Sequence, residues 1–229
     1  MSNGCQYRCE PLSGGLGVFT QAPDRVNADA LLLAHFIGRC EGALCDLGTG
    51  CGTVPLALLD RGLCDTACGV DIRPEAVALV QTAVDRFSLH GRLSAVCADW
   101  CALPADGYAV VSANPPYFAE GAGALPADPA RRVMRFGDAD CFASLCAAAR
   151  RLLRDDGRFC VCVPPARLDD MTAAMQEAGF YPSRRRDVLS VGEKRFLCLV
   201  EAVPFAVETA VLPSWDMTDS DFLKELYNE

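Results

Sequence analysis

The chain has 229 residues, 51% of them apolar, which is enough to bury a substantial core without disulfides or bound metal. Its formal net charge of -9 argues at first against a nucleic-acid partner, because phosphate contacts require Lys and Arg. It contains no uninterrupted apolar run of about 18 residues, and Met1–Glu10 lacks the basic and then apolar order of a secretory signal. We therefore expect a single cytoplasmic domain over residues 1–229, without a membrane partner.

The excess of acidic residues lies towards the two ends of the chain. Basic residues are instead concentrated between positions 131 and 195, where two interpretations are open. They could form a cationic face for phosphates, or they could be ordinary solvated surface charges. The candidates for such a face are Arg131, Arg132, Arg135, Arg184, Arg185, Arg186, Lys194 and Arg195.

Fourteen cysteines would indicate disulfides in a small secreted chain, but here they are scattered through apolar runs such as Phe159-Cys160-Val161-Cys162-Val163. Pairs such as Cys97 and Cys101 have three residues between them, and no C-x-x-C occurs, so the usual zinc-binding spacing is missing. We expect most cysteines to be small buried hydrophobes, and we expect no metal site.

The predicted elements begin after a glycine-rich opening. Asn27–Ile37 is apolar along most of its length and starts with Asn27 or Asp29 as an N-cap, which predicts a helix. Short apolar runs then alternate with helical periodicity. Further helices are expected at 53–61, 74–87, 141–153 and 167–178. Seven strands are expected, at 43–47, 67–72, 93–97, 109–113, 158–163, 186–190 and 195–202.

The last two predicted strands are separated only by the short turn Val191–Lys194, so they must be antiparallel. The earlier strands alternate with helices, which is typical of parallel pairing. We therefore predict an α/β fold: a Rossmann-like, seven-stranded, mostly parallel sheet with one antiparallel strand and helices on both faces. Residues 1–40 would form a helical and loop extension, 41–203 the core, and 204–229 an acidic tail with a short helix near 219–227.

A glycine-rich loop, Asp46-Leu47-Gly48-Thr49-Gly50-Cys51-Gly52, lies where the first predicted strand meets a helix. Glycines at such a turn allow unusual backbone angles and close approach of a ligand. The dinucleotide fingerprint would require glycine at Thr53, one position later than it occurs here. The spacing D-x-G-x-G-x-G instead matches methyltransferases, whose Asp contacts the amino-acid end of the cofactor. The cofactor-binding residues expected in this loop are Asp46, Gly48, Gly50 and Gly52.

Two more acidic residues end the next predicted strands. Asp71 closes the second strand beside Ile72, and its two carboxylate oxygens can accept hydrogen bonds from two ribose hydroxyls. Asp99 follows the third strand and is placed to bind an adenine amino group, with Trp100 as a flat neighbour. We expect all four residues to bind the cofactor, because ligands lie outside the carboxyl ends of parallel strands. The alternative is that the carboxylates cap the following helices.

The segment Asn114-Pro115-Pro116-Tyr117 follows the fourth predicted strand. The prolines fix φ and remove two donors, so their carbonyls and the Asn114 side-chain oxygen form a rigid set of acceptors for an NH2 group. Holding both hydrogens of a conjugated amine helps its nitrogen to pyramidalise towards a methyl sulfonium, while Tyr117 would stack on the flat substrate. We expect these four residues to be catalytic, with Asn114 also at the cofactor. A simple turn is the alternative.

With these motifs, the chain resembles the bacterial tRNA (adenine-N6) methyltransferases that modify the adenine beside the anticodon of a valine tRNA. The similarity covers most of residues 15–203. It begins at Asp24-Arg25-Val26-Asn27-Ala28-Asp29-Ala30-Leu31-Leu32-Leu33-Ala34, includes the two motifs above and ends at Leu199-Val200-Glu201-Ala202. The resemblance implies tRNA as the partner and S-adenosyl-L-methionine as the cofactor, bound by Gly48, Asp71 and Asp99, with Asn114 to Tyr117 holding the target amine.

Asn-Pro-Pro-Tyr also resembles the signature of enzymes that methylate adenine in DNA or the glutamine amide of release factors. Methylation of a protein glutamine or another planar amine is therefore the alternative function, favoured by the acidic charge. A cofactor-binding scaffold without catalysis is a third possibility. Gly121–Pro129 is rich in Gly, Ala and Pro and is expected to form a lid over the substrate. The sequence leaves the oligomeric state open.

Overall fold

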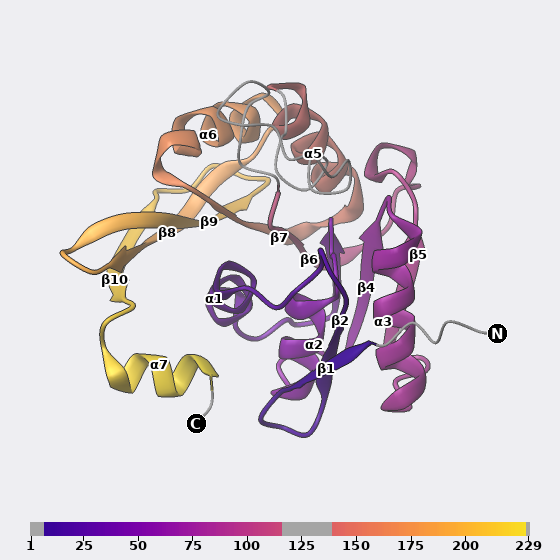
Figure 1. Ribbon diagram of the computed structural model, residues 1–229. Coiled ribbons are helices and arrows are strands. Elements are labelled where there is room, and N and C mark those ends of the chain that lie inside the picture. The colour runs from indigo at the N-terminus through magenta and orange to yellow at the C-terminus, as the bar shows by residue number, and fades with distance from the viewer. Residues whose placement is uncertain (1–6, 116–138, 228–229) are drawn as a thin grey trace.

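The computed structural model describes residues 7–115 and 139–227. Its strands are β1 (Arg8–Pro11), β2 (Gly17–Thr20), β3 (Ala43–Leu47), β4 (Thr66–Asp71), β5 (Leu93–Cys97), β6 (Tyr108–Ala113), β7 (Leu153–Val163), β8 (Tyr181–Ser190), β9 (Lys194–Val203) and β10 (Ala210–Asp216). Eight of them form a main sheet in the order β10-β8-β9-β7-β6-β3-β4-β5, while β1 and β2 form a separate antiparallel pair (Figure 1).

The helices lie close to their predicted positions. They are α1 (Ala28–Ile37), α2 (Thr53–Asp60), α3 (Pro74–Arg86), α5 (Ala139–Leu152), α6 (Leu168–Glu177) and α7 (Ser220–Tyr227), with short 3-10 turns η1 (Trp100–Ala102) and η2 (Pro165–Arg167). At the start of α1, the Asn27 side chain accepts a hydrogen bond from the backbone N–H of Ala30 at 2.8 Å. Asn27, and not Asp29, is therefore the N-cap.

Among the described strands of the main sheet, only β9 runs against the others: it is antiparallel to β7 and β8, and the remaining neighbours are parallel. The predicted Rossmann-like α/β class with one reversed strand is confirmed. The predicted number of seven strands is wrong, because β10 adds an eighth beside β8. Pro213 and a register shift between Leu212 and Trp215 weaken the strand pattern there, and an edge strand tolerates both.

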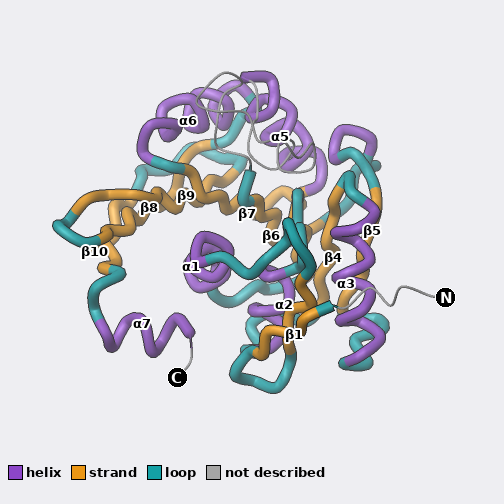
Figure 2. The backbone as a smooth tube through the Cα atoms, in the orientation of Figure 1, coloured by secondary structure: helices purple, strands orange, loops and turns teal. Residues whose placement is uncertain are grey.

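Helices cover both faces of the sheet, as predicted. Buried side chains of α1, α2 and α3 belong to one core cluster, and those of α5 and α6 belong to a second. Figures 1 and 2 show α5 and α6 on one side of the sheet and α1 on the other. Most of the described cysteines are buried in these clusters, which confirms that they act as small hydrophobes. The buried ones are Cys40, Cys45, Cys51, Cys64, Cys68, Cys146, Cys160, Cys162 and Cys198.

The chain after β9 is anchored on α1 by an aromatic cluster. Trp215 of β10 stacks on Phe222 of α7 with ring centroids 5.1 Å apart, and the ring of His35 meets Trp215 nearly edge-on at 4.9 Å. Arg61 donates to Nδ1 of His35 at 2.9 Å, and Nε2 lies 3.3 Å from the carboxylate of Glu225. Burial and the adjacent Arg61 lower the pKa of His35, so the neutral ring accepts at one nitrogen and donates at the other.

A buried ion-pair network ties three strands to the end of α1. Glu201 of β9 pairs with Arg158 of β7 at 2.6 Å and with Arg184 of β8 at 2.8 Å. Both arginines also donate to backbone carbonyls at the C-terminus of α1, Arg158 to Ile37 at 3.0 Å and Arg184 to Phe36 at 2.9 Å. Burial alone would raise the pKa of Glu201, but the two arginines outweigh it and lower that pKa. The pairing thus satisfies both the buried carboxylate and the helix end.

We predict that Glu201→Gln lowers the free energy of unfolding by about 3 kcal/mol, because it leaves two largely buried guanidinium groups without their anion. Urea unfolding followed by circular dichroism measures this. Glu208→Gln changes an exposed carboxylate of the same chain and is the matched control, with an expected change within about 0.5 kcal/mol. Equal unfolding midpoints for the two variants would contradict the structural role of the network.

Candidate functional site

The candidate site lies along the carboxyl edge of the parallel strands. β3 pairs with β4 on one side and with β6 on the other, so the direction in which the chain builds the sheet changes between β3 and β6. Ligands of open α/β sheets bind outside the strand ends at such a switch point. Asp46 near the end of β3, Asp71 at the end of β4, Asp99 after β5 and Asn114 after β6 all lie on this edge.

Asp46 and Ser112 join the two strands at the switch point. They face each other in the β3–β6 register, and the Ser112 hydroxyl donates to Oδ1 of Asp46 at 2.6 Å. The Asp46 residue is only 2% exposed. Burial raises the pKa of Asp46 to about 6, and the bond from Ser112 opposes this rise by stabilising the ionised carboxylate. A cationic group that approaches Asp46 would stabilise its ionised form further.

The glycine loop is fixed against β4. The N–H groups of Gly48 and Thr49 both donate to the Val70 carbonyl, at 2.8 and 2.9 Å. Gly48 and Gly52 have φ values of +72° and +79°, in a backbone region that residues other than glycine rarely adopt. At Gly52 a Cβ would also lie 3.0 Å from Val80 of α3. The loop therefore requires glycine for both its conformation and its packing.

Asp71 lies within a network of donors. Its Oδ2 accepts from the backbone N–H of Gly50 at 2.9 Å, and its Oδ1 accepts from the backbone N–H of Arg73 at 2.9 Å. The Arg73 guanidinium lies 3.3 Å from each carboxylate oxygen of Asp71. It also forms a bidentate pair with Asp24, at 2.7 and 2.8 Å. Burial disfavours the guanidinium charge, but the hydrogen bonds that Arg73 donates to Asp24 and the charge of Asp71 raise the pKa of Arg73.

Ile72 and Trp100 supply apolar surface near these carboxylates. Ile72 is 57% exposed, unusually so for a large apolar side chain directly after a buried strand. Trp100 lies 3.8 Å from the position that a Cβ on Gly48 would occupy, and its ring N–H donates to the Ser144 hydroxyl at 3.2 Å. The segment around Trp100 is held by Arg151 of α5, which donates to its backbone carbonyls.

Asp99 is exposed and caps η1, because its Oδ1 accepts from the backbone N–H of Cys101 at 2.8 Å. The capping alternative therefore applies to this carboxylate, although its second oxygen is not used in that bond. Asp71 likewise accepts from the backbone before α3. Asp46 instead accepts from the Ser112 hydroxyl on the neighbouring strand.

Asn114 follows β6, beside the switch point. Its side-chain oxygen accepts a hydrogen bond from the thiol of Cys162 on β7 at 3.2 Å, which orients the amide. Pro115 is buried behind it. Pro116, Tyr117 and the expected lid Gly121–Pro129 lie outside the described residues, so the structure places only the first two members of the predicted acceptor cluster.

The described basic residues do not form one unpaired cationic face. Arg184 is engaged by Glu201, while Arg185 and Arg195 both pair with Asp187, at 2.7 and 3.1 Å. Arg186 packs over the Trp215 ring at 4.4 Å. Strand alternation on β8 directs neighbouring side chains to opposite faces. Arg131, Arg132 and Arg135 lie outside the described residues.

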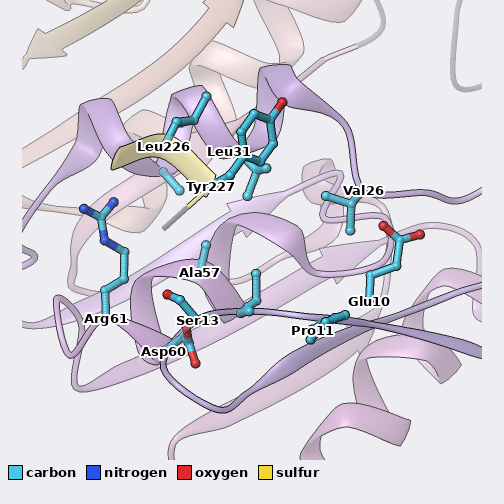
Figure 3. Close-up of a pocket in the computed structure, with 12 residues that line it drawn as sticks. Glu10, Pro11, Ser13, Val26, Leu31, Ala57, Asp60, Arg61, Leu226 and Tyr227 are labelled. Atoms are coloured by element: carbon cyan, nitrogen blue, oxygen red, sulfur yellow. The ribbon is translucent and has the colours of Figure 1, made fainter. Parts of the chain in front are cut away.

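A pocket of about 180 Å³ lies elsewhere, between the β1–β2 connection, α1, α2 and the end of α7 (Figure 3). None of the candidate site residues lines it. Within residues 7–115 and 139–227, no cluster of three or more His, Cys, Asp or Glu side chains could hold a metal ion. No helix in the same ranges is long and apolar enough to cross a membrane.

Sequence patterns did not indicate several residues that shape this edge: Asp24, Arg73, Ser112, Ser144 and Arg151. Ser112 had a usable signal, since it lies two residues before Asn114 at the end of the fourth predicted strand. Arg73 follows Asp71 by two residues, which places both at the same turn. Asp24 had none, because it lies 49 residues from its partner and meets it only in the folded chain.

Residues 13–177 match the methyltransferase small domain family. A tRNA1(Val) (adenine(37)-N6)-methyltransferase from Bacteroides thetaiotaomicron is 28% identical over 170 residues, which cover 72% of this chain and 70% of that protein. A release factor glutamine methyltransferase from Rhodospirillum rubrum is 31% identical over 165 residues, which cover 69% of this chain and 50% of that protein.

Two solved structures share the fold. A predicted O-methyltransferase from Agrobacterium tumefaciens superposes with a TM-score of 0.68 at 18% identity, over 87% of this chain and 95% of that one. A T. thermophilus 16S rRNA N2 G1207 methyltransferase, solved with AdoMet and guanosine, gives 0.56 at 21% identity, over 86% and 44%. With its glycine loop at the switch point of a Rossmann-like sheet, the chain belongs to the methyltransferase small domain family, whose cofactor is S-adenosyl-L-methionine.

Proposed function

We propose that this enzyme methylates N6 of an adenine in tRNA, at the position next to the anticodon. The observation that carries the proposal is the position of Asn114 and Pro115 at the end of β6, directly beside the strand that leads into the glycine loop. The acceptors for an amine thus border the cofactor loop. The similarity to the tRNA1(Val) enzyme over 72% of the chain supports tRNA adenine as the source of that amine.

The residues of this edge fit S-adenosyl-L-methionine. Asp46 would meet the positively charged amino-acid end, while Asp71 would accept hydrogen bonds from the ribose hydroxyls. The exposed Ile72 and the ring of Trp100 offer apolar surface for the adenine, and Asp99, beside Trp100 in the chain, would accept from its amino group. Gly48, Gly50 and Gly52 keep the loop free of side chains where the cofactor approaches.

When bound, the cofactor supplies an electrophilic methyl group on a sulfonium. The protein must then orient an amine whose lone pair is delocalised into a ring. The Asn114 side-chain oxygen, oriented by the Cys162 thiol, and the Pro115 carbonyl are both acceptors, so each would hold one hydrogen of the amine. Fixing both hydrogens favours a pyramidal nitrogen with its lone pair directed at the methyl group. Pro116 and Tyr117 would complete the grip, with the tyrosine ring stacked on the base.

A protein glutamine amide is the second candidate substrate, since it also presents a planar NH2 group. The similarity to the release factor glutamine methyltransferase favours it, although the chain spans half the length of that protein. The pairing of Arg184, Arg185 and Arg195 with carboxylates favours it as well, because those arginines are then less available to phosphates.

We predict that cofactor affinity decreases as the pH falls below 7. Burial raises the pKa of Asp46 to about 6, so lowering the pH from 7 to 5 protonates a carboxylate that the cationic end of the cofactor requires. The dissociation constant should rise about tenfold over this interval, as expected for one group with that pKa. Isothermal titration calorimetry with S-adenosyl-L-methionine measures it.

Two variants check the assignment of this pH dependence. Asp46→Asn should bind weakly and with no pH dependence over the same interval. Ser112→Ala removes the bond that stabilises the ionised carboxylate, so the midpoint of the transition should move to a higher pH. A wild-type affinity that is constant from pH 7 to 5 would exclude Asp46 from the cofactor site.

We predict that Asn114→Ala lowers the rate of methyl transfer by at least about 100-fold, because one of two fixed acceptors is lost. The reaction is run with radiolabelled S-adenosyl-L-methionine and total bacterial RNA, and the labelled nucleoside is identified after digestion. Cofactor binding by calorimetry should persist in the variant, which separates the loss of chemistry from unfolding. A fully active variant would exclude the amine-holding role of Asn114.

The identity of the labelled product decides between the substrates. Label in N6-methyladenosine from the tRNA fraction supports the proposal. Label in a glutamine side chain of an added release factor, with none in RNA, supports the second candidate and leaves the assignment of Asn114 intact.

A further inference from the structure

Arg73 lies between the carboxylates of Asp24 and Asp71 and binds the first more closely than the second. It binds Asp24 through two short hydrogen bonds, NH1 to Oδ2 at 2.8 Å and NH2 to Oδ1 at 2.7 Å. Its contacts with Asp71 are both 3.3 Å. Charge-assisted N–H to O bonds are typically about 2.7–2.9 Å, so only the pair with Asp24 is a strong one. Asp24 and Asp71 are 3% and 6% exposed, and water therefore screens neither interaction well.

The same contacts leave acceptor capacity on Asp71. An ionised carboxylate offers about two acceptor sites on each of its oxygens. On each oxygen of Asp71 a backbone N–H uses one of them at 2.9 Å, from Gly50 on Oδ2 and from Arg73 on Oδ1. The second site on each oxygen meets the guanidinium only at 3.3 Å. A stronger donor, such as a hydroxyl, can replace that contact at little cost.

We infer that Asp24 and Arg73 act as a positioning pair, in which Asp24 holds the guanidinium close enough to balance the charge of Asp71 but too far to occupy its acceptor sites. This inference rests on the proposed role of Asp71 at the cofactor ribose. Without Asp24, the guanidinium is free to turn and form its own two-pronged bond with Asp71, which consumes the acceptors that the ribose needs. Asp24, in the segment before α1, thus keeps the acceptor sites of Asp71 available by holding Arg73, which lies 49 residues away in the sequence.

Asp24 is also well fixed where it stands. It precedes α1, and an isolated β-bridge joins it to Gln21. A Cβ on Gly50 would lie 3.5 Å from Oδ1 of Asp24, so the carboxylate lies directly beside the cofactor loop. The loop, the end of β4 and the N-terminal segment therefore meet at Arg73.

The test compares two probes that differ only at the ribose, 5′-methylthioadenosine and its 2′-deoxy analogue. Calorimetry should show that the wild-type protein prefers the ribose compound by about tenfold or more, as expected for a hydroxyl donating to a charged acceptor. Asp24→Asn should reduce this preference to less than about threefold, while the affinity for the deoxy analogue changes little.

The double variant Asp24→Asn with Arg73→Gln distinguishes positioning from a merely structural ion pair. It removes the guanidinium that competes for Asp71, so the preference for the ribose compound should return towards the wild-type value. A structural role predicts instead that the double variant is no better than the single one. The double variant also leaves no buried guanidinium without an anion, and urea unfolding of both variants verifies that they are folded.

Each outcome is decisive for a different statement. If the wild-type protein does not distinguish the two probes, the proposed role of Asp71 at the ribose is wrong. If it distinguishes them and Asp24→Asn does so equally well, Asp71 keeps its role and the positioning pair is wrong. A double variant whose preference stays as low as that of the single variant would also overturn the inference.

Discussion

The position of β3 between β4 and β6 is the constraint on which the rest of the site depends. All three strands are parallel, so their carboxyl ends meet at one edge and the last residues of each strand come together there. Asp46 and Ser112 mark the centre of this edge. The glycine loop is then fixed to β4 through Val70, and Asn114 follows β6 directly. The glycine loop and the proposed amine acceptors are neighbours because β3 pairs with both β4 and β6.

Several arginines of this protein form ion pairs with nearby carboxylates. Arg158 and Arg184 share Glu201, Arg185 and Arg195 share Asp187, and Arg73 is shared by two carboxylates. An acidic chain with many buried carboxylates needs such pairs, because an isolated ion is costly in a poorly hydrated interior. The pairs differ in purpose. The one at Glu201 holds the far strands to α1, whereas the one at Arg73 lies at the proposed cofactor site.

The sequence was sufficient for the class of fold and for the order of the central elements, since β3 to β7 and the five described helices from α1 to α6 follow strong hydrophobic patterns, but it did not predict β1 and β2. It was insufficient for β10, where Pro213 interrupts the pattern and the edge position supplies the tolerance. The positions of Asp46 and Asn114 at the strand ends were predictable, because local sequence patterns mark those ends. The site was not predictable where tertiary contact decides, as at Asp24. The pairing of Arg184, Arg185 and Arg195 with carboxylates was not predictable for the same reason, because strand alternation and carboxylate partners are not visible from the count of arginines.

The hydrogen bond between Ser112 and Asp46 joins residues 66 positions apart, and this has a consequence for the order of folding. The β8–β9 hairpin can form from neighbouring segments, but the β3–β6 pairing must close a long stretch of chain that includes β4, α3 and β5. The proposed cofactor crevice is therefore complete only once this non-local pairing has formed. Any ligand bound there stabilises the completed sheet relative to every partly folded form. Binding of the cofactor would therefore stabilise the β3–β6 pairing that creates its own site.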